Sequence, residues 1–265
     1  MCIFRVNTLV KFFVKYNNFT TFVRDLLKCD FFINNNTKKI KIMWLIDSSI
    51  GRKLIMSITG ICLVLFLTFH GVMNLVLIFS PEGYNMICGF LGANWYALVA
   101  TLVLAAGFII HILYAFYLTL QNLRARGKER YAVTERQEGV EWSSKNMLVL
   151  GLIIIGFLGL HLYNFWFKMQ FAELTGLHTG AYDPKNGAAY VTELFANPIY
   201  CIVYLVWLGA LWFHLTHGVW SALQSLGLNN KIWLTRVKAI ANVVSTLVVL
   251  LFVAVVVFCF VSSLI

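Results

Sequence analysis

The chain has 265 residues, of which 60% are hydrophobic and only 12% are charged, and its mean hydropathy is +0.78. Soluble globular domains are about half apolar and a quarter charged, so this composition excludes an ordinary soluble domain and indicates a membrane protein. The formal net charge of +10 would suit a nucleic-acid-binding protein, but the basic residues alternate between the two sides of the apolar stretches described below.

Residues 1–42 differ in composition from the rest of the chain. They are rich in Asn, Phe, Lys, Thr and Ile and contain no cleavage-type signal. We expect that the natural start is Met43 and that the upstream stretch is translated non-coding sequence. A polar-flanked amphipathic arm is the alternative. The membrane domain is then residues 43–265.

Apolar stretches long enough to cross a bilayer, which takes about 20 residues, follow one another along this domain. They lie at about 54–79, 95–120, 146–171, 198–225 and 237–263. The sequence therefore predicts an all-α membrane protein, a bundle of five transmembrane helices. The longest polar connections, about 121–145 and 172–197, contain no glycine-rich phosphate loop and no nucleophile motif. The chemistry must therefore lie in the bundle or in partner subunits.

Basic residues collect on alternate sides of the predicted spans. Ten Lys and Arg precede the first span, six lie in 121–145 and three in 226–238, whereas the opposite side has only Lys168 and Lys185. The bias predicts that the N-terminus is inside and the C-terminus outside. The basic inner face either docks a soluble partner or only contacts anionic lipid headgroups.

Four histidines lie inside four different apolar stretches: His70, His111, His161 and His217. An ionisable side chain is costly in a membrane and indicates a functional site, and imidazole is a common iron ligand. Four histidines suffice for two bis-histidine haems between the first four helices. The six cysteines form no C-x-x-C or C-x-x-C-H pattern, so the sequence predicts non-covalent b-type haem.

Depth along the helices predicts how these histidines pair, because a helix rises about 1.5 Å per residue. His70 and His161 share an outer level, and His111 and His217 share an inner level. His214, three residues before His217, is the alternative fourth ligand. A porphyrin also needs gaps between helices, and small residues lie near each histidine, although glycine serves ordinary helix packing too. These are Gly71, Gly107, Gly156, Gly159 and Gly218.

Together, several motifs resemble the di-haem cytochrome b membrane anchor of succinate:quinone oxidoreductases, that is, succinate dehydrogenase or fumarate reductase of the five-helix type. The resemblance spans about 44–263. Its motifs are Ser48-Ser49-Ile50-Gly51-Arg52-Lys53, Met56-Ser57-Ile58-Thr59-Gly60, Phe69-His70-Gly71, Phe108-Ile109-Ile110-His111, Leu160-His161-Leu162-Tyr163 and His214-Leu215-Thr216-His217-Gly218.

The resemblance implies that His70, His111, His161 and His217 are the haem axial ligands, with His217 chosen because the family's ligand directly precedes a glycine. It also implies that Ser57 and Trp142 contact haem propionates, which Arg52, Lys53 and Lys145 would neutralise. Some relatives carry a glutamate two residues before the fourth ligand, where this chain has Leu215. His214 is the one nearby ionisable substitute for a proton route.

The same resemblance implies a place in a respiratory complex of the bacterial cytoplasmic membrane. A flavoprotein subunit and an iron–sulfur subunit would bind the cytoplasmic face, and the flavoprotein would perform the succinate or fumarate chemistry. This chain would then be a non-catalytic electron-transfer subunit at which a membrane quinone, expected to be menaquinone, reacts. The rival interpretations are the cytochrome b anchor of a formate dehydrogenase or hydrogenase, a proton-relay transporter, and a structural scaffold.

Overall fold

The computed structural model describes residues 48–126, 141–177, 179–228 and 230–265. The chain divides into two units, residues 1–55 and 56–265, and the helix bundle considered below is the second unit. The predicted extension at 1–42 lies outside the described residues, as does most of the basic 121–145 connection.

Five helices are long and apolar enough to cross a membrane, which confirms the predicted all-α, five-span architecture. They are α4 (Ser49–Phe79), α6 (Trp95–Arg126), α8 (Met147–His161, which continues through η1 and α9), α11 (Pro198–Ser225) and α12 (Lys231–Ser262). The chain is therefore a multi-pass membrane protein.

The α-helix of the third span changes to a π-helix within the membrane. The π-helical segment η1 (Leu162–Phe171) begins directly after His161, and a short α-helix, α9 (Ala172–Thr175), completes the span. Gly176, with φ of +69°, ends it in the left-handed conformation that glycine adopts most readily.

Two connections between the spans contain helices of their own. In α5 (Pro81–Phe90), Ser80 caps the first turn by accepting the N–H of Gly83 at 3.0 Å, and Pro81 takes the position where a missing N–H costs nothing. In α10 (Gly187–Ala196), Asn186 caps by accepting the N–H of Ala189 at 3.3 Å. The short helix α7 (Trp142–Lys145) precedes α8.

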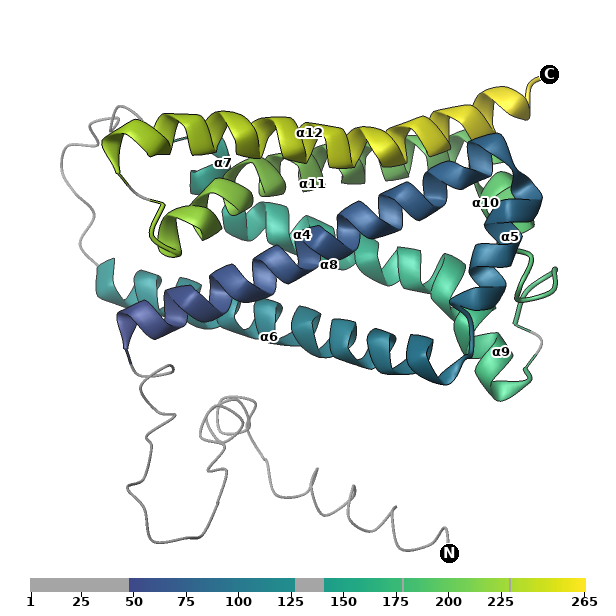
Figure 1. Cartoon of the computed structure of the whole chain (residues 1–265), viewed down its shortest axis with the longest axis horizontal. Coiled ribbons are helices and arrows are strands. Elements are labelled where there is room, and N and C mark those ends of the chain that lie inside the picture. The colour runs from purple at the N-terminus through teal and green to yellow at the C-terminus, as the bar shows by residue number, and fades with distance from the viewer. Residues whose placement is uncertain (1–47, 127–140, 178, 229) are drawn as a thin grey trace, which may run out of the picture. The chain divides into compact units, whose positions relative to one another are not determined.

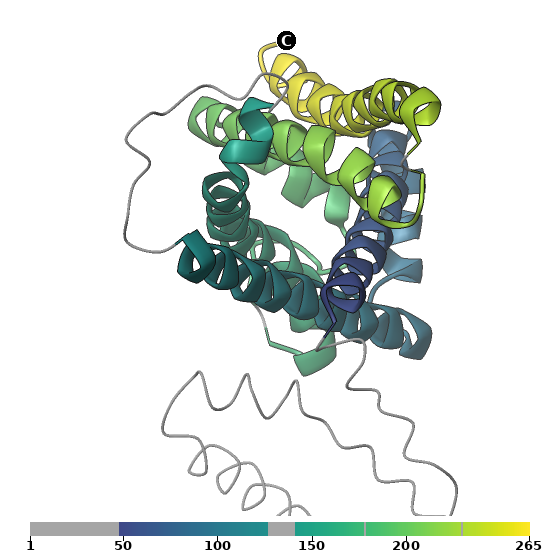
Figure 2. The ribbon, with the colours of Figure 1, turned by 90° about the vertical axis from the view of Figure 1, so that its left-hand side faces the viewer.

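The closest helix packing in residues 56–265 is between α11 and α12, which lie side by side along most of their length (Figure 1). Leu211 and Leu215 of α11 and Val248 and Val255 of α12 belong to one buried apolar cluster. The end-on view in Figure 2 shows α8 beside α11, with α6 on the side of the bundle away from α12.

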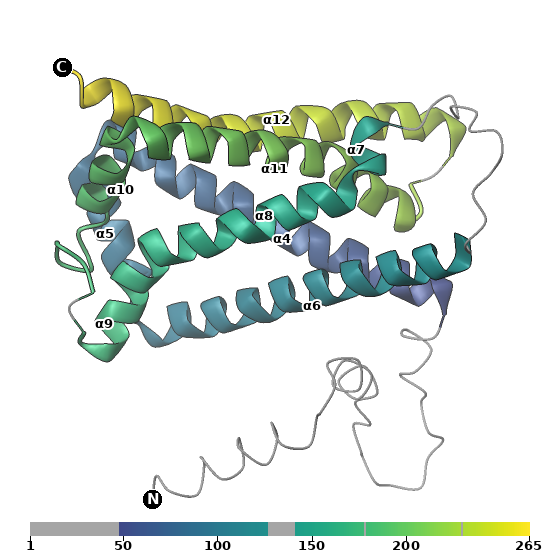
Figure 3. The same ribbon diagram turned by 180° about the vertical axis from the view of Figure 1, so that it is seen from behind.

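The small helices mark the two ends of this bundle. Figure 3 shows α5, α9 and α10 gathered at one end, here called the α10 end, and α7 at the other, the α7 end. Asn85 joins α5 to α10, because its side chain donates to Asn186 at 3.0 Å and accepts the N–H of Ala188 at 2.8 Å.

Candidate functional site: paired histidines within the membrane spans

The structure brings His70 of α4 and His161 of α8 together. Their ring centroids lie 6.0 Å apart and their planes are inclined by 88°. Two imidazoles that bind one metal ion from opposite sides, each through a bond of about 2 Å, have centroids about 6 Å apart. The spacing of this pair therefore suits a single metal ion between the two rings.

Aromatic rings enclose this pair. Phe66, one turn before His70, stacks on its ring with centroids 5.4 Å apart, and Phe252 of α12 lies 5.7 Å from it. Trp207 of α11 lies 5.5 Å from the ring of His161. These side chains exclude water from the two imidazoles and give them an apolar, polarisable surrounding.

Asn74 and Tyr84 hold the backbone and ring of His70. The side-chain amide of Asn74 donates to the carbonyl oxygen of His70 at 2.7 Å and its nitrogen lies 3.4 Å from the ring Nδ1. Tyr84 of α5 donates its hydroxyl to Asn74 Oδ1 at 3.0 Å. Burial raises the pKa of Tyr84 far above its ordinary value, so the hydroxyl stays protonated and remains a donor.

His111 of α6 lies against α4 on one side. Its ring Nδ1 shares a hydrogen bond of 3.1 Å with the Thr59 hydroxyl. A Cβ added at Gly60 would be in ordinary van der Waals contact with His111, 3.5 Å from its Cε1. The hydrogen bond occupies Nδ1 and leaves Nε2 to act as a ligand.

On its other side, the ring contact of His111 among the described residues is with His214 and not with His217. The His111 and His214 centroids lie 6.5 Å apart with planes inclined by 64°. His217 instead packs edge-on against Trp220, at 4.9 Å and 83°, and its Nδ1 lies 3.8 Å from a carboxylate oxygen of Glu141. The structure thus places both candidate fourth ligands on α11, one beside His111 and one beside Glu141.

Glu141 precedes α7 and is tied to α11 and α12. It accepts hydrogen bonds from the Lys238 ammonium at 3.0 Å and from the Trp220 indole at 3.1 Å. Burial alone would raise the pKa of this carboxyl, but the hydrogen bonds from Lys238 and Trp220 and the charge of Lys238 outweigh it and hold the pKa below its ordinary value. Glu141 is therefore ionised at neutral pH.

The two predicted propionate contacts lie in different surroundings. Ser57 is buried on α4, two residues before Thr59. Trp142 is 59% exposed at the start of α7, and its ring meets Phe213, the residue before His214, at 5.2 Å. Both residues are therefore near the elements that carry His111 and His214.

Several features test whether the bundle fits a flat prosthetic group. His161, His214 and His217 each have a buried Nδ1 without a hydrogen-bond partner. A Cβ added to any of four of the predicted gap-forming glycines would meet no atom within 4 Å: Gly107, Gly156, Gly159 and Gly218. Buried imidazole nitrogens without a partner are available for a ligand, and histidine is a common haem ligand.

An apolar cavity of about 270 Å³ opens between α4 and α6. Phe66, which stacks on His70, and Gly107, one turn before His111, both line it. No described group of three or more His, Cys, Asp or Glu side chains is placed to hold a metal ion, but a haem iron takes at most two protein ligands.

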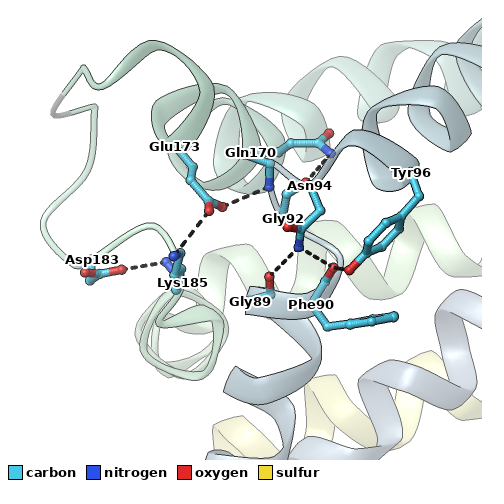
Figure 4. Close-up of polar contacts among 10 residues, drawn as sticks. Gly89, Phe90, Gly92, Asn94, Tyr96, Gln170, Glu173, Asp183 and Lys185 are labelled. Carbon is cyan, nitrogen blue, oxygen red and sulfur yellow. Dashed lines mark hydrogen bonds and ion pairs between the residues drawn. The ribbon is translucent and has the colours of Figure 1, made fainter.

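Gln170 and Glu173, on η1 and α9, fasten the loop between α5 and α6 to the α10 end (Figure 4). Gln170 donates to the carbonyl oxygen of Gly92 at 3.0 Å and accepts the Thr101 hydroxyl at 3.1 Å. Glu173 accepts the N–H of Ala93 at 3.2 Å and pairs with Lys185 at 3.5 Å. These contacts fix the end of the span that carries His161.

Sequence reasoning missed the roles of Thr59, Asn74 and Glu141. A signal existed for Asn74, because it lies four residues after His70 and positions four apart share a helix face. Thr59 and Glu141 reach their histidines from other helices, so no local spacing connects them. Comparisons of the chain with protein-family models, with curated proteins and with solved structures found no match.

Proposed function

We propose that this chain is the membrane-anchor subunit of a succinate:quinone oxidoreductase, either a succinate dehydrogenase or a fumarate reductase. It holds two non-covalent b-type haems and passes electrons between an iron–sulfur subunit and a membrane quinone, with menaquinone expected. A flavoprotein subunit carries out the succinate or fumarate chemistry. The chain lies in a bacterial cytoplasmic membrane with its N-terminus inside.

The observation that carries this proposal is the spacing of His70 and His161. Two histidines from different helices lie within membrane spans with ring centroids 6.0 Å apart, the separation that two imidazoles holding one iron would have. Burying two imidazoles in a membrane without a ligand would cost free energy, and binding a shared ligand would offset that cost.

His111 supplies a ligand for the second haem, with its Nδ1 hydrogen-bonded to the Thr59 hydroxyl and its Nε2 left for the iron. Its partner comes from α11. The family resemblance favours His217, whereas His214 has the nearer ring. The two lie three residues apart on α11, about 4.5 Å along its axis and about 60° apart around it.

When bound, haem supplies one-electron redox chemistry that imidazole side chains lack. His70, His111, His161 and a histidine of α11 would hold the iron atoms, and the surrounding aromatic and aliphatic side chains would keep water away. The aromatic rings around His70 and His161 lower the local dielectric, which tunes the reduction potential.

The charges of the described residues support the proposed orientation. Arg124, Lys145, Arg236 and Lys238 lie at the α7 end, where Glu141 pairs with Lys238. Lys168 and Lys185 lie towards the α10 end, where Glu173 pairs with Lys185. The positive-inside rule puts the more basic end in the cytoplasm, so the partner subunits would meet the α7 end.

Purification of the tagged chain from native membranes in mild detergent tests this function. We expect a flavoprotein and an iron–sulfur subunit to co-purify, and succinate to reduce part of the haem. Co-purification of a formate dehydrogenase or hydrogenase catalytic subunit instead would assign the chain to another respiratory complex. Recovery of the chain without any redox subunit would contradict the proposal.

A further inference from the structure

Glu141, His217, Trp220 and Lys238 form a cluster at the α7 end, contributed by the residue before α7 and by α11 and α12. Glu141 pairs with Lys238 at 3.0 Å, and the Lys238 ammonium lies 4.3 Å from the centre of the Trp220 ring. Trp220 donates its indole N–H to Glu141 Oε2 at 3.1 Å and packs edge-on against His217. Each member of the cluster thus contacts at least two of the others.

This cluster fixes the Glu141 carboxylate in one place. Lys238 binds one oxygen and Trp220 binds the other, so the carboxylate cannot turn away without losing a charge-assisted hydrogen bond. The oxygen that Trp220 binds is the one that lies 3.8 Å from His217 Nδ1. A closer approach of about 1 Å would bring the two atoms to hydrogen-bond distance.

Glu141 is placed to accept a hydrogen bond from the ring of His217. Its Nδ1 is buried and has no hydrogen-bond partner, and Glu141 is the acidic group beside it. His214 also has a buried Nδ1 without a partner, but its ring lies beside another imidazole, that of His111. The two neighbouring histidines of α11 therefore differ in whether a carboxylate faces Nδ1.

A carboxylate at Nδ1 changes what the imidazole can do. It holds the proton on Nδ1, leaves the lone pair on Nε2, fixes the ring orientation and makes the imidazole a better electron donor to a metal. We propose that Glu141 is a positioning residue for His217, which it selects over His214 as the axial ligand opposite His111, and that it lowers the reduction potential of that haem. This inference rests on the proposed haem-binding function.

Replacement of Glu141 by Gln tests the inference, with redox titration and EPR spectroscopy of the purified complex as readouts. Glu141→Gln should raise the midpoint potential of one haem and alter its EPR signal, and leave the second haem unchanged. The matched control is Glu193→Gln, which removes the same charge from an exposed position on α10. In this control variant both haems should keep their wild-type potentials and spectra. Wild-type potentials and spectra for both haems in Glu141→Gln would overturn the inference.

Two further variants keep the inference testable if Glu141→Gln does not assemble. His217→Ala should lose one haem, whereas His214→Ala should retain both, each with its wild-type EPR signal. Loss of a haem from His214→Ala, with both retained in His217→Ala, would overturn the role of Glu141 while leaving the proposed function intact. A wild-type complex without haem would instead overturn the proposed function itself.

Discussion

His70 and His161, from α4 and α8, have ring centroids 6.0 Å apart and ring planes inclined by 88°. If both bind the same iron, His70→Ala and His161→Ala should each remove the same haem and spare the other. Optical redox titration of the two variants checks this, because the potential of the surviving haem should be identical in both. Survival of different haems would show that the two histidines do not share an iron.

The inclination of these rings predicts a spectroscopic property. Axial imidazoles with nearly perpendicular planes give a low-spin ferric haem whose EPR signal is strongly anisotropic, with one large g value. The haem lost from His161→Ala should be the one with such a signal. A wild-type spectrum typical of two haems with parallel imidazole planes would contradict the inclination of His70 and His161, which Phe66, Phe252 and Trp207 surround.

Asn74 should tune the haem held by His70, because its amide lies 3.4 Å from the ring and donates to the His70 carbonyl. Asn74→Leu removes both interactions while it keeps the branching of the side chain, and should shift the potential of this haem alone. Loss of a buried hydrogen bond also costs about 1 kcal/mol of stability. Tyr84→Phe, which keeps Asn74 against His70, serves as the control and should shift the potential less. An equal shift in both variants would assign the effect to the Tyr84 hydroxyl instead.

Gly71 should be intolerant of larger side chains. A Cβ there would lie 3.1 Å from Leu251 Cβ, which cannot move without its backbone, so α4 and α12 meet closely at this point. Gly71→Leu should lower the free energy of unfolding by about 1–3 kcal/mol through overpacking. Gly151→Leu is the matched control on α8, because a Cβ there meets no atom within 4 Å. Thermal unfolding in detergent should separate the two, and equal melting temperatures would argue against a close α4–α12 contact.

Cys88 should react slowly with thiol reagents. Burial raises the pKa of its thiol to about 11 from 9.0, so less of the reactive thiolate is present at pH 8. The rate of iodoacetamide labelling at pH 8 should be about 100-fold lower than in the chain unfolded in SDS, and should rise up to about pH 11. Mass spectrometry of the Cys88 peptide measures this rate. Equal rates in the folded and unfolded chain would contradict burial of the thiol.

The number of membrane helices was predictable because an apolar stretch long enough to cross a bilayer is rare in other kinds of structure. The ends of these helices were less predictable. The first span begins at Ser49 rather than near 54, because Ser48 accepts the Gly51 N–H and the helix continues through Arg52 and Lys53. The helices α5 and α10, of ten residues each, lie in segments that the sequence analysis left as connections, since both are too short to cross a bilayer. Their capping residues, Ser80 and Asn186, were the available signals.

Which histidines meet was predictable only in part. Depth depends on counting residues, and His70 and His161 lie together in the structure, as equal depth predicts. The choice between His214 and His217 depends on the rotation of α11 about its axis, which packing against α8 and α12 determines. The π-helical segment after His161 also changes the angle between successive side chains around the helix. The apolar periodicity of the sequence does not reveal this change.

The haem content of the purified chain tests the central claim most directly. The dithionite-reduced pyridine complex, set against protein concentration from amino-acid analysis, should give two b-type haems per chain in the wild type. His70→Ala and His111→Ala should each give one, and the double variant none. A wild-type chain that folds in the membrane and contains no haem would contradict the account.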